Sequence, residues 1–294
     1  MTSAADEAVR EAATDSVTFA FGDASAQLYG LARLGLSRSD DGERRGSALA
    51  VLFAGREPVA ALARGDLPVG DDAGWEAIEL GGLHATVAAP LERWTVGFDA
   101  GDGHGFALEL SALGDAAVLA DDDPAARLGG MAGYEQPCRV RGSVRTGGRE
   151  RAFDGLGQRG HAWGAANWER LELARTVTAW TDAGSAALTA LRPAGAGDHA
   201  AETTWAAAWD AEQGLLLDVA DGRLSTTYDG DGHTRRAGLE LWIHGADWPR
   251  RGAGEVLCGS SLDLGALRLD CSFFHWHFEG HEGVGRYDVV RRAA

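Results

Sequence analysis

The feature that most restricts the fold is a period-two alternation of apolar residues, which recurs along almost the whole chain. Val17, Phe19 and Phe21 alternate with small or polar residues, and similar runs follow at spacings of roughly 8–12 residues. Such alternation places the apolar side chains on one face of a β-strand. After the N-terminal residues, no window keeps a helical period over more than about ten residues. The sequence therefore predicts an all-β fold with few short helices.

The turns between these runs are short and rich in glycine, as in Gly81–Gly82. Many short strands joined by such turns are typical of an antiparallel sandwich or a closed barrel. The segment 114–130 breaks the pattern with an acidic run before Pro124, so we expect a domain boundary there. We predict two barrel-like β domains, residues 1–128 and residues 129–294. A small closed barrel leaves no free edge strand and can hold one apolar ligand.

Composition and charge exclude several classes of protein. With 294 residues, 45% of them hydrophobic, the chain can bury a sizeable core. The net charge of −17 disfavours nucleic acid and anionic membrane surfaces as partners. Residues 1–16 lack the apolar stretch of a signal peptide, and no run approaches the ~18 apolar residues of a membrane span. Because the three cysteines also lack a metal-type spacing, we expect a cytoplasmic protein with reduced thiols.

The segment Gly155–Trp168 is dense in glycine, histidine, arginine and tryptophan, and it does not alternate. We therefore expect it to be a loop, the kind of element that often carries binding or catalysis. If it turns inward, His161 can act as an acid or base near neutral pH. Trp163 and Trp168 would then line an apolar pocket or stabilise positive charge through their ring faces. The alternative is a structural plug, with the histidine bonded to backbone and the tryptophans capping a barrel end.

This segment, together with Tyr134-Glu135-Gln136, resembles the signature of the AttH-like family. That family includes the hydroxyneurosporene synthases, which are carotenoid 1,2-hydratases, and related Diels–Alderases and terpenoid cyclases. Further similar stretches are Arg93–Val96, Leu108–Leu110 and Gly283–Asp288. The similarity extends over most of the chain. It implies a fold of two lipocalin-like antiparallel β-barrels packed together, in agreement with the strand pattern.

The resemblance also implies a function. It points to a cofactor-independent hydratase, cyclase or isomerase that takes a hydrophobic isoprenoid substrate into a pocket between the two domains. His161 would be the acid or base, and Tyr134 and Glu135 would be further catalytic polar groups. The residues expected to contact the substrate are Trp163, Trp168, Arg159, Asn167 and Tyr287.

Three positions in the segment depart from the family pattern. Gly160 stands where the family tends to have aspartate, Ala166 where it tends to have arginine, and Asn167 where aspartate is frequent. The change at Gly160 removes the neighbouring carboxylate that would orient or acidify His161. A non-catalytic lipid-, pigment- or terpenoid-binding protein of the lipocalin type is therefore the alternative. The sequence leaves the oligomeric state open, and a homo-oligomer is compatible with it.

Two polar stretches raise the question of a metal. In 275–282, a strand would place His275, His277 and Glu279 on one face, and His281 follows, a set that suits a transition metal. An ordinary strand with a polar face is the alternative that we favour. The acidic stretch 229–233 lacks the distal glutamate of a calcium loop and predicts a hairpin turn. We therefore expect neither a metal nor a cofactor.

Overall fold

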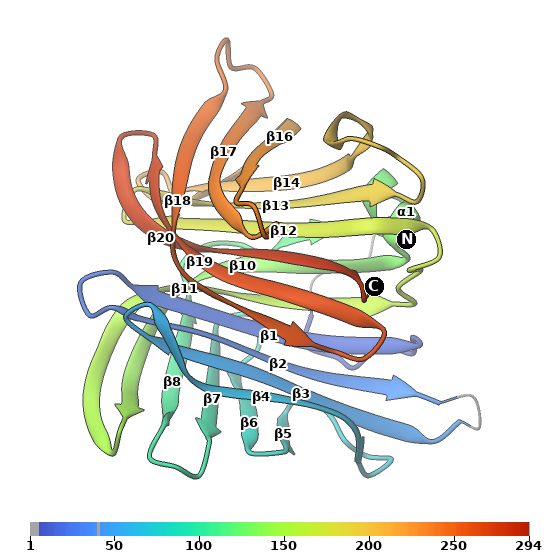
Figure 1. Cartoon of the computed structure of the whole chain (residues 1–294), viewed down its shortest axis with the longest axis vertical. Helices are drawn as coiled ribbons and strands as arrows, with labels where there is room; N and C mark the ends of the chain where they lie inside the picture. The colour runs from blue at the N-terminus through green and yellow to red at the C-terminus, as the bar shows by residue number, and fades with distance from the viewer. Residues whose placement is uncertain (1–5, 40–41, 294) are drawn as a thin grey trace. The chain divides into compact units, whose positions relative to one another are not determined.

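The structure, a computed structural model, describes residues 6–39 and 42–293. The chain divides into two compact units. The first comprises Met1–Ala120 and Met131–Ala166, and the second comprises Asp121–Gly130 and Asn167–Ala294. Each is a nearly closed antiparallel β-barrel of the lipocalin-like kind, which confirms the predicted fold class (Figure 1).

The first unit is one antiparallel sheet in the order β4-β3-β2-β1-β11-β10-β8-β7-β6-β5, with β9 paired to β10. Its strands are β1 (Thr14–Asp23), β2 (Leu28–Arg38), β3 (Arg44–Ala54), β4 (Glu57–Pro68), β5 (Ala77–Leu80), β6 (Leu83–Ala89), β7 (Arg93–Asp99), β8 (Gly105–Ala112), β9 (Ala117–Leu119), β10 (Met131–Thr146) and β11 (Arg149–Gly164). In Figure 1, β5–β8 run across β1–β4.

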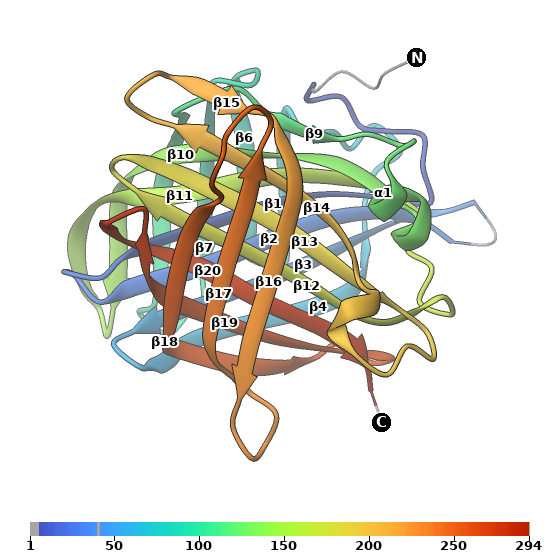
Figure 2. The same ribbon diagram turned by 90° about the horizontal axis from the view of Figure 1, so that it is seen from above.

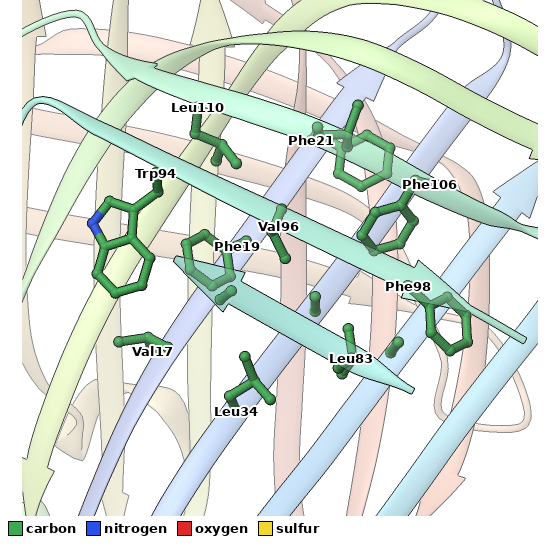
Figure 3. Packing of buried hydrophobic residues seen from close by; sticks show 14 of the residues in the cluster. Val17, Phe19, Phe21, Leu34, Leu83, Trp94, Val96, Phe98, Phe106 and Leu110 are labelled. Atoms are coloured by element: carbon green, nitrogen blue, oxygen red, sulfur yellow. The ribbon is translucent and has the colours of Figure 1, made fainter. Parts of the chain in front are cut away.

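The interior of this barrel is filled by the apolar side of the alternating strands. Figure 3 shows Val17, Phe19 and Phe21 of β1 pointing toward Val96 and Phe98 of β7. These side chains are almost completely buried, as the alternation predicts. The rings pack in edge-on and tilted arrangements, which suit the charge distribution of aromatic rings.

The segment expected to be a loop is in fact part of a strand. β11 continues to Gly164, so only the last four residues of the segment lie outside it, and each residue from Leu156 to Gly164 has a partner on both β1 and β10. The alternation is hidden because the inward positions hold glycine and polar residues instead of aliphatic ones. A Cβ at Gly157 would lie 2.2 Å from a backbone oxygen of β1 and 2.8 Å from a side-chain atom of β10. Glycine is therefore needed there for close packing, and not for a turn.

The division between the units differs from the predicted one at residues 128 and 129. The segment Met131–Ala166 belongs to the first unit, because β10 pairs with β8 and β9, and β11 pairs with β1. The polar run at 121–123 precedes α1 (Pro124–Gly129), which belongs to the second unit. Asp123 caps that helix by accepting a hydrogen bond from the N–H of Ala125.

The second unit is one antiparallel sheet in the order β15-β14-β13-β12-β20-β19-β18-β17-β16. Its elements besides α1 are β12 (Leu171–Thr181), β13 (Gly184–Pro193), a 3₁₀ turn η1 (His199–Ala201), β14 (Thr203–Asp210), β15 (Leu215–Leu217), β16 (Val219–Tyr228), β17 (Thr234–Ile243), β18 (Arg250–Asp263), β19 (Leu267–Phe278) and β20 (His281–Arg292). Figure 2 shows β16–β18 lying across β12–β14, and β16 contacts β14.

A carboxylate on β19 holds three elements of the second barrel together. Asp270 accepts hydrogen bonds from Ser261 of β18 and from Arg268, and it pairs with Arg291 of β20. Burial alone would raise the pKa of Asp270, but the hydrogen bonds and the charge of Arg291 lower it below the ordinary value.

Because the folded state prefers the ionised form, Asp270 stabilises the protein above the ordinary aspartate pKa of about 3.9. Its contribution is lost as the pH falls through the lower pKa of the folded state. We expect Asp270→Asn to reduce the free energy of unfolding by about 1–2 kcal/mol at pH 7. Denaturant titrations from pH 7 to pH 3 should show the difference shrinking at the acid end. A difference independent of pH would contradict this assignment.

Cys138, Cys258 and Cys271 are free and buried. Burial raises the pKa of Cys138 and of Cys258 to about 12, so neither thiol offers a reactive thiolate at neutral pH. No helix among the described residues is long and apolar enough to cross a membrane.

Candidate active site in the first barrel

Three neighbouring strands bring a set of polar side chains to the inward face of the first barrel. On β11, Arg159, His161 and Trp163 are successive inward residues and all are buried. His161 lies opposite Tyr134 of β10 on one side and Val17 of β1 on the other. Polar groups inside a barrel need partners, because burying an unpaired polar group costs free energy.

The partner of His161 is Asp15. The Nε2 atom of His161 lies 2.6 Å from Oδ1 of Asp15, and both side chains are at most 2% exposed. The second carboxylate oxygen, Oδ2, accepts a hydrogen bond of 2.5 Å from the backbone N–H of Arg10. His161 thus has a carboxylate partner on β1, a strand more than a hundred residues away in the sequence.

The surroundings of the imidazole indicate where its protons lie. Its Nδ1 atom is 3.3 Å from the backbone carbonyl oxygen of Asp6, which can only accept. Nδ1 can therefore only donate to it, and the contact between Nε2 and Asp15 is a hydrogen bond whose proton either group can hold. The pair thus holds a transferable proton in a place shielded from water, which is the requirement for a general acid.

Aromatic rings surround His161. The ring centroids of Trp163, Tyr134 and Trp75 lie 5.2, 5.6 and 6.1 Å from that of the imidazole, each at a steep interplanar angle. Trp75 is fully buried. Tryptophan and tyrosine rings can stabilise a cation through their faces, so this wall suits a reaction in which positive charge develops.

A second ion pair involves Arg159, the inward residue of β11 that precedes His161. Arg159 donates from Nη1 to Oε1 of Glu7 at 2.6 Å, and its Nε and Nη2 donate to Oε1 of Gln136 at 2.8 and 2.5 Å. Gln136 in turn donates to the backbone oxygens of Leu91 and Gly114. The guanidinium is therefore held in one position by a side chain whose own amide is fixed.

Glu7 accepts from three further donors. The backbone N–H of Leu91 and the indole N–H of Trp94 donate to Oε1 at 2.8 and 3.0 Å, and the hydroxyl of Tyr134 donates to Oε2 at 3.1 Å. Burial raises the pKa of Tyr134 well above its ordinary value, against the opposing effect of the Arg159 charge, and the Glu7 carboxylate raises it further. Tyr134 therefore remains a hydrogen-bond donor at every physiological pH.

Residues 6–13, which we call the N-terminal strap, form neither helix nor strand, yet they supply Asp6, Glu7 and Arg10 to this site. The guanidinium of Arg10 lies 4.5 Å above the ring of Trp163. Beside Asp15 a hollow of about 240 Å³ remains, bordered by Val9, Arg10 and Leu36. The strap itself covers the inward polar groups, because Asp6 contacts His161 and Glu7 pairs with Arg159.

The second barrel has a polar cluster of its own. Arg175 is fully buried and pairs with Glu202, and it donates to the hydroxyls of Thr226 and Tyr287 at 2.7 and 3.1 Å. Glu202 also lies 2.5 Å from His199. Burial, with Arg175 acting against it, raises the pKa of Tyr287, so this hydroxyl is also neutral. The cluster ties β12, β16 and β20 to the segment before β14.

A hollow of about 560 Å³ opens next to this cluster. His199 and Tyr228 stack against each other at its wall, with ring centroids 6.1 Å apart. Charged side chains form much of the rest of the lining, among them Glu169, Glu172 and Arg192. Such a polar lining suits a water-filled groove better than an enclosed site for an apolar ligand.

Comparison with known proteins assigns the chain to a family. A family model described as a domain of unknown function (DUF7064) matches residues 5–289. The chain belongs to the DUF7064 family. No curated protein matches the sequence at a significant level.

Three solved structures share the fold of this DUF7064 protein. AttH from Nitrosomonas europaea has a TM-score of 0.69 and 13% identity, covering 96% of this chain and 94% of that chain. CghA has a TM-score of 0.64 and 14% identity, covering 95% and 88%. Kievitone hydratase from Nectria haematococca has a TM-score of 0.61 and 11% identity, covering 95% and 89%. The AttH-like resemblance is thereby confirmed, and at these identities the likeness establishes the fold and not the reaction.

The structure brings together some of the residues predicted from the DUF7064 sequence and not others. His161, Tyr134, Arg159 and Trp163 all line the inside of the first barrel. Three of the other predicted residues, namely Asn167, Trp168 and Tyr287, belong to the second unit. Trp168 accepts hydrogen bonds from Arg292 through its backbone oxygen, and Asn167 lies in the turn after β11.

Glu135 faces the opposite side of β10 from Tyr134 and Gln136. Its carboxylate accepts a hydrogen bond of 2.7 Å from Gln158. A Cβ at Gly160, directly across the strand pair, would lie 2.7 Å from the same carboxylate. Gly160, which has no side chain, thus leaves room for the Glu135 carboxylate on that face.

We therefore expect Glu135→Gln to keep turnover within about threefold of wild type, because the side chain does not reach the inward face. The glutamine side chain in the variant keeps an oxygen that can accept the hydrogen bond from Gln158. Steady-state rates of the two proteins on the same substrate would check this. A loss of a hundredfold or more would restore Glu135 to the catalytic set.

Several residues of the site, among them Glu7, Asp15 and Gln136, were not predicted from the sequence as site residues. Two of them carried a signal. Asp15 is in phase with Val17 and Phe19 of β1, and Gln136 is in phase with Tyr134 of β10, so both are polar residues at inward positions. Glu7 lies in the N-terminal strap, where no period exists to place it.

The two stretches considered for a metal have simpler arrangements. On β19 and β20, the exposed His275 and His277 both lie within ion-pair distance of Glu282. The turn after β16 brings ligand atoms of Asp229, Asp231 and His233 within 4.8 Å of one another. There Asp229 accepts hydrogen bonds from the backbone of Asp231 and His233, as in an ordinary polar turn.

Proposed function

We propose that this protein is a cofactor-independent enzyme that hydrates, cyclises or isomerises a hydrophobic, isoprenoid-like substrate inside the first barrel. The observation that carries the proposal is the buried pair of Asp15 and His161, whose atoms are 2.6 Å apart within a wall of aromatic rings. Such a pair supplies a proton without any bound cofactor.

In the proposed first step, the substrate displaces the Asp6 carbonyl, and His161 gives its Nδ1 proton to one carbon of a substrate double bond while Nε2 stays bonded to Asp15. The electron pair of that double bond forms the new C–H bond. The other carbon becomes cationic, and the rings of Trp163 and Tyr134 stabilise it. In a hydration, a water oxygen then bonds to the cation and releases one proton to His161. In an isomerisation or cyclisation, the proton comes from a neighbouring carbon instead. Asp15 stabilises the imidazolium and holds the ring in place.

The shared fold gives this class of reaction further support, because one of the similar structures is named as a hydratase. That support is an analogy between folds at 11% identity. The residues Asp15, His161, Tyr134 and Trp163 carry the chemical argument, and the substrate class rests on the AttH-like resemblance and on the apolar walls of the site.

A second candidate function, a non-catalytic binding protein, is favoured by one observation. The strap already saturates the site, because Glu7 and Asp6 occupy the hydrogen-bonding groups of Arg159 and His161. A barrel closed in this way could retain a lipid or pigment without converting it.

Incubation with terpenoids and carotenoids, followed by mass spectrometry of the extract, separates the two functions. The enzyme proposal predicts a product with wild type and a loss of at least about a hundredfold with His161→Ala. The matched control is His84→Ala, on an exposed position of β6, which should behave like wild type. Ligand that is retained but recovered unchanged from wild type would overturn the enzyme proposal.

A further inference from the structure

We propose that the first barrel binds the carboxylate of a hydrophobic carboxylic acid at the position that the Glu7 side chain occupies, so that Glu7 is an internal substitute for the ligand. The inference deepens the proposed function by naming the substrate class, and it rests on that function only in taking this barrel as the substrate chamber.

Four donors converge on the Glu7 carboxylate. They come from β11, β10, β7 and the turn before β7, which are all parts of the barrel wall. The combination of one guanidinium, one backbone N–H, one indole N–H and one neutral hydroxyl is a complete set of donors for an anion. Without an acceptor, the buried Arg159 would carry an uncompensated charge, so the wall itself requires an anion at this point.

The backbone conformation of Leu91 is independent support for an anion site at this position. Leu91 has a φ of 57°, in the left-handed region that residues other than glycine rarely adopt. That conformation lets its N–H point at the Glu7 carboxylate while its carbonyl accepts from Gln136. Strained backbone of this kind occurs disproportionately at ligand-binding sites, where it holds a donor ready.

Glu7 itself is held by a weaker framework than its donors. The strap has no regular secondary structure. Besides Glu7, it is held by hydrogen bonds of Asp6 and of the Arg10 N–H, by the Arg10 guanidinium over Trp163, and by the packing of Val9 and Ala12. A tethered group competes with a free ligand at an effective concentration of about the millimolar range. A free carboxylic acid with an apolar body can displace it, because the body gains burial that Glu7 does not provide.

The place of His161 fixes where such a ligand would react. Arg159 and His161 are successive inward residues of β11, and these are roughly 7 Å apart in a strand. Tyr134 lies beside both, since the Arg159 guanidinium is 5.7 Å from its ring. When the carboxylate of the ligand is bound at Arg159, the ligand carbons a few bonds away from it lie next to His161, the proposed acid. The expected substrate is an unsaturated hydrophobic acid with its double bond at that distance.

The test measures binding of sodium phenylacetate to the full chain by tryptophan fluorescence and by thermal shift. Glu7→Ala vacates the carboxylate position, so we expect it to bind phenylacetate at least about tenfold more tightly than wild type. Phenylacetamide, the neutral analogue, should bind neither protein, and acetate should bind Glu7→Ala more weakly than phenylacetate. Adding Arg159→Met to Glu7→Ala should abolish the effect. Glu11→Ala, at an exposed strap position, is the matched control and should resemble wild type.

Equal affinity of wild type and Glu7→Ala for phenylacetate would overturn the inference, as would equal binding of phenylacetamide. If Glu7→Ala fails to fold, Glu7→Gln serves, since a neutral side chain is easier to displace and should give a change in the same direction.

His161→Asn separates this inference from the proposed function. If wild type and His161→Asn both bind the carboxylate but neither of them turns over substrate, the proposed enzyme fails and the anion site stands. Turnover that is indifferent to a carboxylate on the substrate would remove the anion site and leave the enzyme.

Discussion

Replacing Asp15 with asparagine is expected to lower turnover by about 10²–10⁴-fold while the barrel stays folded. The asparagine amide keeps the size of the side chain and an acceptor for the N–H of Arg10. It cannot stabilise an imidazolium, and its NH₂ group would donate to Nε2 of His161, which keeps the ring neutral and therefore a much weaker acid. Steady-state kinetics would show the loss in kcat more than in KM, because the interaction matters most when His161 changes its charge.

The control for this change is Asp23→Asn, at the other end of the same strand. Asp23 caps the turn after β1 by accepting from Ser25 and Ala26, far from the inward polar cluster. We expect its turnover to equal that of wild type. Near-ultraviolet circular dichroism of both variants would check that the aromatic packing around His161 is intact. If Asp15→Asn kept wild-type turnover, the pair would be structural only.

The largest expected effect on stability is that of Arg175→Met in the second barrel. Arg175 is fully buried, and methionine would leave the Glu202 carboxylate without its main partner. The hydroxyls of Thr226 and Tyr287 would lose the guanidinium donor and keep the hydrogen bond to each other. Breaking a buried pair from one side costs about 3–5 kcal/mol. Denaturant titration should therefore show a loss of about that size in the free energy of unfolding of this barrel.

The double variant Arg175→Met with Glu202→Leu tests whether the loss of stability comes from the unpaired Glu202 carboxylate. Replacing both charges by apolar groups removes the unpaired carboxylate, so the double variant should recover much of the loss. Arg236→Met is the control, because Arg236 and Glu255 form an exposed pair, and such pairs contribute about 0–1 kcal/mol. If Arg175→Met lost less than about 1 kcal/mol, Arg175 would not be the electrostatic centre of this barrel.

Much of the architecture follows from the sequence because period-two alternation is a local property. The phase of the alternation also places individual residues. Asp15 shares the phase of Val17, and Glu135 is out of phase with Tyr134, so the sequence held the information that the first is inward and the second is not. The prediction of Glu135 as a catalytic residue instead followed the family motif, which does not distinguish the two faces of a strand.

The remaining features depend on contacts between distant parts of the chain. Glu7 and Arg159 are 152 residues apart, and no local pattern indicates that an irregular strap enters a barrel. The loop prediction for Gly155–Gly164 was wrong because the inward residues of β11 are glycine, arginine, histidine and tryptophan, and the two charged or polar ones pair with groups distant in the sequence. The division of the units differs for the same reason, since β11 reaches its place in the sheet by pairing with β1.

The central claim is that His161 carries the proton to the substrate, and the most direct measurement is the transfer of solvent deuterium. Wild type and His161→Asn would each be incubated in D₂O with a converted substrate from the panel, and the product analysed by mass spectrometry and NMR. We predict one new carbon-bound deuterium at a single position and on a single face in the wild-type product, and no product above background with His161→Asn. Product formed at an undiminished rate by His161→Asn, with the same deuterium, would contradict the claim.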